Sequence, residues 1–173
     1  ANNKGCENRG KCFDAPCKLK EQLKRLEETG YVLCSTGREL MNADGSSTGR
    51  TIPVKEKITY RELLKHNSIN CSSVILRRDV AREFPMEHDD SHEDYITWLK
   101  ILRKYGCAAG INKPYLKYRL SEGGKSRNKL KSAAMTYNVY RYAGYGRIRS
   151  CIFFCSYAVH GIWKYCYCSL RSQ

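Results

Sequence analysis

Hydrophobic positions in this chain recur mostly at helical spacing, and the pattern predicts five helices. They span residues 16–28, 60–65, 91–105, 129–142 and 147–167. The helix over 91–105 is the best specified, because its aromatic and aliphatic residues share one face and Gly106 ends the pattern. A capping-box match from Thr59 to Glu62 marks the start of the helix over 60–65.

The apolar faces of these helices predict which side of each one is buried. The residues expected inward are Leu19, Leu23 and Leu26 in the first helix, Tyr95, Trp98, Leu99, Leu102 and Tyr105 in the third, and Leu130, Ala134 and Tyr137 in the fourth. Three shorter stretches, 31–36, 72–76 and 107–120, are typical of strands, whereas 45–50 and 121–125 are expected to be loops. The elements do not alternate regularly, so the order predicts a mixed α/β fold.

Charge is distributed unevenly along the 173 residues, a length that suits one compact domain. There are 31 Lys and Arg against 17 Asp and Glu, and the net charge is +14. Residues 1–97 hold 16 basic and 16 acidic side chains, whereas residues 98–173 hold 15 basic ones and a single acidic one, Glu122. The C-terminal part therefore favours an anionic partner, either phosphate groups or an anionic membrane surface. Nucleic acid is the least favoured partner, because the basic residues are scattered and no reading motif is present.

Cysteines and apolar runs bear on where the chain resides. The ten cysteines form no CxxC pair, so a zinc site is disfavoured. A disulfide scaffold is disfavoured because the chain is long and shows no secretion signal. No secretion signal is visible, and no run reaches the roughly 18 apolar residues of a membrane span. We therefore expect a cytoplasmic chain with reduced thiols. Its last helix fits two roles equally well: an amphipathic helix at a membrane interface, or a domain-closing helix whose aromatic face packs inward.

An acidic cluster lies just before and within the start of the helix predicted over 91–105. It consists of Glu87, Asp89, Asp90, Glu93 and Asp94. Asp94 follows Ser91 by three residues, which is the spacing of a capping pair, and the first turn of a helix stabilises negative charge. Spacing alone therefore favours a capping role for Asp94. The alternative is a general base at a helix N-terminus that faces a cleft.

Two basic segments, 117–119 and 125–129, form a second candidate site around a glycine-containing loop. Such a loop can bind a diphosphate through charge-assisted hydrogen bonds from Lys, Arg and hydroxyl groups. Composition alone fits a solvated basic loop somewhat better.

Four motifs, in this order, carry a resemblance to a known family. They are YxELLxxNxI over 60–69, SSV over 72–74, EDYxxWL over 93–99 and YRxSxxxxSxxK over 118–129. Together they resemble the family-2 glycosyltransferases of bacterial cell-surface polysaccharide synthesis, from about residue 16 to the end of the chain. The resemblance implies an incomplete GT-A-type (nucleotide-diphospho-sugar transferase) α/β domain over 1–146, with a mixed sheet and flanking helices. A C-terminal amphipathic helical segment would follow over 147–173.

The resemblance also implies a reaction and its residues. The family transfers a sugar from a nucleotide-sugar donor to a saccharide or lipid-linked acceptor, with Asp94 as the catalytic base and Glu93 assisting it. The residues expected to bind substrate are Arg119, Ser126 and Lys129, near the diphosphate, together with Trp98 and Ser73. The protein would work in the cytoplasm, peripherally at the inner face of the plasma membrane.

The beginning of the chain departs from the family pattern. An acidic triplet that holds Mn²⁺ or Mg²⁺ is expected there, and only Asp14 remains of it, while the nucleotide-binding elements expected before Ala1 are absent. One carboxylate makes a poor site for either metal ion. The chain is therefore expected to be inactive alone. The alternative is a non-catalytic remnant that binds a partner or an anionic membrane surface through its basic C-terminal half.

Overall fold

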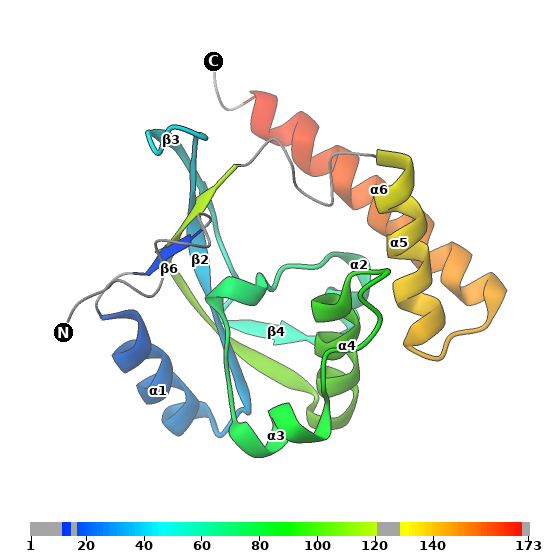
Figure 1. Ribbon diagram of the computed structural model, residues 1–173, viewed down its shortest axis with the longest axis horizontal. Coiled ribbons are helices and arrows are strands. Elements are labelled where there is room, and N and C mark those ends of the chain that lie inside the picture. The colour runs from blue at the N-terminus through cyan, green and yellow to red at the C-terminus, as the bar shows by residue number, and fades with distance from the viewer. Residues whose placement is uncertain (1–11, 15–16, 121–128, 171–173) are drawn as a thin grey trace.

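A mixed sheet runs through the middle of the molecule, with α1 on one side and α2, α4, α5 and α6 on the other (Figure 1). The structure is a computed structural model that describes residues 12–14, 17–120 and 129–170. Its elements are β1 (Cys12–Asp14), α1 (Lys18–Thr29), β2 (Leu33–Met41), β3 (Ser47–Ile52), β4 (Lys57–Thr59), α2 (Tyr60–Lys65), the 3₁₀ turn η2 (Cys71–Ser73), β5 (Ile75–Leu76), α3 (Arg78–Glu83), α4 (Glu93–Tyr105), β6 (Cys107–Arg119), α5 (Lys129–Tyr142) and α6 (Arg147–Leu170). The predicted α/β class is therefore confirmed.

The sheet is built around the long strand β6. Its order is β1-β6-β2-β3, and β4 pairs with β6 while β5 pairs with β2. Strands β2 and β6 are parallel, and all the other pairs are antiparallel. The β2–β6 register shifts between Thr36 and Arg38, where a Cβ on Gly37 would lie 3.0 Å from the carbonyl oxygen of Lys113. This irregularity accommodates Pro114, which has no N–H to donate to a regular ladder.

Helix α4 supplies the centre of the hydrophobic core. Its buried residues are Tyr95, Ile96, Trp98, Leu99, Ile101 and Leu102, and Gly106 caps its C-terminus as predicted. The Tyr95 hydroxyl donates to the carbonyl oxygen of Leu63 at 2.6 Å, and the Tyr140 hydroxyl donates to that of Leu64 at 2.9 Å. Two tyrosines from α4 and α5 thus satisfy the carbonyls at the end of α2, so the three helices pack as one unit.

The start of α2 confirms the capping box read from the sequence. The Thr59 hydroxyl accepts a hydrogen bond from the Glu62 N–H, and the Glu62 carboxylate accepts one from the Thr59 N–H at 3.1 Å. A hydrogen bond from Lys55, together with the Thr59 N–H, lowers the pKa of Glu62 to about 2. Local chemistry alone fixes this helix start.

The predicted inward face of α1 is wrong. Leu19 and Leu23 are 58% and 48% exposed, whereas Lys18 and Gln22 are buried. The Gln22 side-chain amide donates to the carbonyl oxygens of Cys34 at 3.0 Å and Ser73 at 2.9 Å. These two bonds tie α1 to β2 and η2, so the polar side of the helix faces the sheet.

Two further predictions fail. Leu130 and Ala134 of α5 are exposed, and the helix buries Met135, Val139 and Tyr140 instead. The predicted loop over 45–50 contributes to β3, because the turn over 42–46 returns the chain along β2. The sequence also did not predict α3. For α5, packing against α4 and α6 selects the buried face, whereas β3 follows from the turn that joins it to β2.

Helix α6 closes the side of the domain formed by α2 and α5. Phe153, Phe154 and Tyr157 pack against the core, with the Phe153 ring 4.9 Å from that of Tyr145 and 5.6 Å from that of Tyr140. The inward packing that the sequence left as one of two alternatives is therefore observed for this stretch of α6. Among the described residues, no helix has the length and apolar character needed to cross a membrane.

Candidate functional site

The acidic cluster of the sequence lies at the N-terminal end of α4. Asp94 occupies the first turn, half-buried, and its carboxylate accepts a hydrogen bond from the Tyr95 N–H at 2.7 Å. Burial raises the pKa of Asp94, and the neighbouring Glu93 adds to the increase, while the Tyr95 N–H and His92 oppose it. A carboxylate with a raised pKa holds a proton more readily, which suits a general base.

The capping role predicted for Ser91 is wrong. The N-cap of α4 is His92, which makes no side-chain capping bond. The Ser91 hydroxyl is buried and donates to the carbonyl oxygen of Met135 in α5 at 2.8 Å. Asp94 still benefits from the positive end of the helix dipole. It does not, however, form a capping pair with Ser91, so the structural alternative to a catalytic role loses its main support.

A stacked pair holds the loop before α4 in place. The His88 ring lies on that of Tyr142 with centroids 3.9 Å apart and an interplanar angle of 8°. The Tyr142 hydroxyl donates to the Asp90 carboxylate at 2.9 Å, and this bond raises the pKa of Tyr142. His88 has a φ of 68°, a conformation that non-glycine residues rarely adopt. Helix α5 therefore fixes the approach to Asp94, a role that no sequence motif indicated.

The predicted diphosphate-binding residues occupy the end of β6 and the segment that follows it. Arg119 is the last residue of β6, half-buried, and it pairs with Met41 in the β2–β6 ladder. Ser126 lies outside the described residues, as does the side chain of Lys129, the first residue of α5. The structure thus places one member of this set, and the other two stay predictions.

Trp98 and Ser73 do not reach the surface. Trp98 is 2% exposed in the core, and Ser73 is fully buried. The Ser73 hydroxyl donates to the carbonyl oxygen of Asn70 at 2.8 Å and lies 2.8 Å from the Ser35 hydroxyl. A direct substrate contact by either residue would require the core to open. In this structure Trp98 belongs to the hydrophobic core, and Ser73 is a buried residue bonded to its neighbours.

The described residues do not form a metal site. No group of three or more His, Cys, Asp or Glu side chains among them is arranged to hold a metal ion. Asp14 lies in β1 opposite Leu116 of β6, and its side chain is outside the described residues. The described residues therefore do not form a divalent-cation site by themselves.

The sequence matches bacterial sugar-transferring proteins over most of its length. TuaG of Bacillus subtilis, named as a teichuronic acid biosynthesis glycosyltransferase, is 35% identical over 124 residues, which cover 72% of this chain and 49% of TuaG. WfaP of Escherichia coli, named as a UDP-Glc:alpha-D-GlcNAc-diphosphoundecaprenol beta-1,3-glucosyltransferase, is 34% identical over 143 residues, which cover 81% of this chain and 55% of WfaP. The chain is related to bacterial glycosyltransferases. No protein-family profile matches it.

The fold is also similar to that of a protein of known structure. The crystal structure of S. aureus TarS 1–349 in complex with UDP-GlcNAc is similar to this structure, with a TM-score of 0.56 over 85% of this chain and 45% of TarS, at 11% sequence identity. At this identity the likeness concerns the fold alone, a partial glycosyltransferase domain of the GT-A type. This chain spans about half the length of the curated relatives that it matches.

Proposed function

We propose that this chain forms the acceptor-side half of a family-2 glycosyltransferase, in which Asp94 is the catalytic base. The observation that carries the proposal is the Asp94 carboxylate itself, which is half-buried, has a raised pKa and is held by the Tyr95 N–H. The relationship to glycosyltransferases supports the same assignment, because Asp94 stands in the EDYxxWL motif.

The proposed reaction transfers a sugar from a nucleotide-sugar donor to a hydroxyl of a saccharide or lipid-linked acceptor. The acceptor oxygen attacks the anomeric carbon of the sugar, and the bond from that carbon to the diphosphate oxygen breaks. The acceptor's proton passes to the Asp94 carboxylate, which becomes neutral, and Glu93 in the same helical turn assists because its negative charge favours the protonated form of Asp94. The nucleoside diphosphate leaves with the electron pair, and Arg119, Ser126 and Lys129 stabilise its negative charge.

Three features of the relatives support the substrate classes in this proposal. TarS was crystallised with a nucleotide sugar, UDP-GlcNAc. The name of WfaP describes a UDP-Glc donor and a diphosphoundecaprenol-linked acceptor. The name of TuaG describes biosynthesis of a cell-envelope polymer, teichuronic acid. A divalent cation is expected for the complete enzyme, where it would stabilise the leaving diphosphate. Such an enzyme would act at the cytoplasmic face of the membrane.

We also infer that the 173 residues are inactive alone, because they span about half of the relatives' length and only Asp14 remains of the acidic triplet that the family resemblance implies. The division into 1–146 and 147–173 is part of the same proposal, since α6 begins at Arg147. The second candidate, a non-catalytic binding protein, is supported by the 15 basic residues against one acidic residue in 98–173.

Fusing this chain to the N-terminal half of TuaG tests the proposed base. We expect the fusion to transfer sugar and the unfused chain to show no turnover. Asp94→Asn should reduce the single-turnover rate of the fusion by about 10² to 10⁴, because an amide does not accept the proton. The raised pKa further predicts that the wild-type rate falls as the pH decreases, when Asp94 becomes protonated.

Glu87→Gln provides the matched control. Glu87 belongs to the same acidic cluster, and its carboxylate is exposed and pairs with Lys100 at 3.5 Å. Removing this charge should change the rate by no more than about twofold, because exposed ion pairs contribute little. Equal rate losses in Asp94→Asn and Glu87→Gln would show that Asp94 is not the base. Turnover by the unfused chain, lost in Asp94→Asn, would overturn its inferred inactivity alone.

A further inference from the structure

Helix α6 has two opposite apolar faces, and one of them lies in solvent. The inward face holds Phe153, Phe154 and Tyr157 against the core. The outward face carries Ile148, Ile152 and Val159, which are 79%, 60% and 63% exposed, together with the exposed Cys155. The spacing of 4, 3 and 4 residues places these four side chains along a single stripe of the helix. We call Ile148, Ile152, Cys155 and Val159 the outer stripe.

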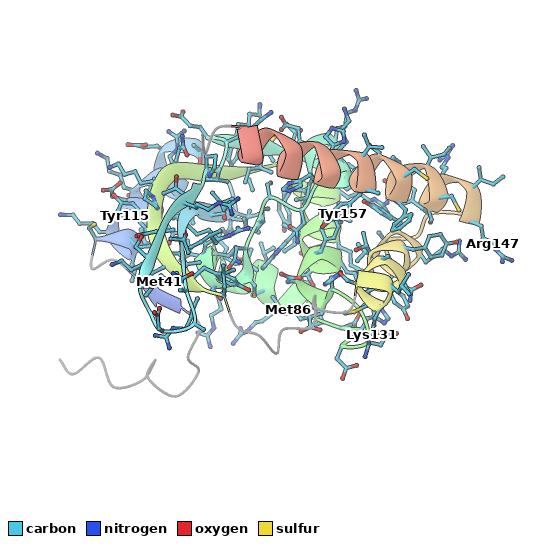
Figure 2. The ribbon with its side chains drawn as sticks, turned by 90° about the horizontal axis from the view of Figure 1, so that it is seen from above. Met41, Met86, Tyr115, Lys131, Arg147 and Tyr157 are labelled. Atoms are coloured by element: carbon cyan, nitrogen blue, oxygen red, sulfur yellow. The ribbon has the colours of Figure 1, made fainter. Side chains whose placement is uncertain are left out.

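Basic side chains border the outer stripe at the start of the helix. Arg147 and Arg149 are both exposed, and each lies about 100° around the helix from Ile148, on opposite sides of it. In Figure 2, α6 runs along the outside of the molecule, with Arg147 at its N-terminal end and Tyr157 on the side of the domain. The sequence over 129–170 contains six Lys and Arg and no Asp or Glu.

We propose that the outer stripe docks on an anionic lipid bilayer, with α6 lying in the plane of the interface. An apolar stripe bordered by arginines suits such a surface, because the aliphatic groups enter the acyl boundary and the guanidinium groups reach the lipid phosphates. The helix lies on the bilayer rather than across it, since its opposite face is already occupied by the core. This proposal goes beyond sugar transfer and does not depend on that activity.

A second copy of the chain is the main competing occupant. The spacing of the outer stripe also suits a two-helix coiled coil. A partner α6, however, would bring the same arginines and no acidic residue to pair with them, so the two helices would repel each other. A bilayer with anionic lipids offers both an apolar layer and negative charge, and it is the occupant that the charges favour.

Vesicle sedimentation with the full 173-residue chain tests the proposal. We expect sedimentation with phosphatidylcholine vesicles that contain phosphatidylglycerol, weaker sedimentation with phosphatidylcholine alone, and a loss of binding as salt screens the charges. The double variant Ile148→Ser/Ile152→Ser should bind roughly tenfold or more weakly, because both aliphatic side chains leave the interface. Arg147→Gln/Arg149→Gln should weaken binding by about fivefold for each charge removed.

Matched controls lie on other faces of the molecule. Leu23→Ser changes an exposed leucine of α1, on the far side of the sheet, and Arg78→Gln/Arg82→Gln removes two exposed charges from α3. Both should bind vesicles as the wild type does. Thermal unfolding checks that every variant is folded. Substitutions at exposed positions should leave the fold intact, whereas deletion of α6 would expose the core.

Three outcomes would overturn the proposal. Equal loss of binding in the outer-stripe variant and in Leu23→Ser would show that the outer stripe is not the docking surface. Equal sedimentation with neutral and anionic vesicles would remove the role of anionic lipid. The wild type could instead form a dimer, dissociated by Ile148→Ser/Ile152→Ser, and fail to bind vesicles. That result would mean that the outer stripe contacts a second copy of the chain.

Discussion

Helices α4 and α6 are both rich in aromatic and aliphatic residues, yet the domain uses them differently. Helix α4 is covered on nearly all sides, with a continuous run of buried residues from Tyr95 to Leu99. Helix α6 buries one face through Phe153 and Tyr157 and leaves a second apolar face in solvent. The comparison shows that similar composition can serve stability in one helix and binding in another, according to how many sides are covered.

The largest expected effect on stability comes from making the same Ile-to-Ala substitution in each of the two helices. Ile101→Ala in α4 removes methyl groups from a fully buried side chain and should lower the free energy of unfolding by about 2–5 kcal/mol. Ile152→Ala in α6 alters an exposed side chain and should change it by less than about 0.5 kcal/mol. Urea unfolding of both variants measures the difference. Similar losses would mean that the outward face of α6 is covered in solution.

A smaller effect tests the hydrogen bonds that join α4 to α2. Tyr95→Phe leaves the buried carbonyl oxygen of Leu63 without its donor and should lower the free energy of unfolding by about 1–3 kcal/mol. Tyr105→Phe, at the exposed end of α4, removes a bond to Glu83 and should lower it by less than about 0.5 kcal/mol. Chemical denaturation distinguishes the two. A Tyr95→Phe protein as stable as the wild type would show that the core repacks around the missing hydroxyl.

The smallest effect concerns α2, which lies between α4 and α6. The pKa of Glu62 is lowered to about 2 by the hydrogen bonds from Lys55 and Thr59. Because the folded-state pKa lies below the usual value of about 4.5, the stabilisation is complete above pH 4.5 and is lost as the pH falls toward 2. Solvent screens this exposed group, so we expect less than about 1 kcal/mol.

The measurement is the stability of wild type and Glu62→Gln across that pH window. The variant should show the smaller loss of stability on acidification, because its side chain does not titrate. Glu28→Gln, which removes an exposed carboxylate of α1, should follow the wild-type profile. Parallel profiles for wild type and Glu62→Gln would mean that the capping box contributes nothing to the pH dependence.

Elements that depend on neighbouring residues were predictable from the sequence. The bounds of α2 and α5 match the prediction, as does the end of α4, because capping and turn residues act within a few positions. The motifs likewise indicated the relationship to glycosyltransferases, and the EDYxxWL motif singled out Asp94. The part of the site that lies within one short sequence motif was therefore predictable.

The loop before Asp94 shows where such prediction ended. Its conformation depends on the stacking of His88 with Tyr142, 54 positions further along the chain. Ser91 looked like a capping residue by spacing, and its hydroxyl instead donates to Met135 of α5. Periodicity describes which residues of one segment lie together, but it does not identify the partner segment.

The sequence by itself determined the mixed order of elements, the best-defined helices, the charge asymmetry and the family resemblance, because each of these follows from residue type and local spacing. The tertiary structure alone decided which face of α1 turns inward, through the bonds from Gln22 to β2 and η2, and which face of α6 remains open. The physical reason is the same in both cases. An amphipathic helix buries the face for which a distant element offers packing or hydrogen-bond partners, and those partners are brought near only by folding.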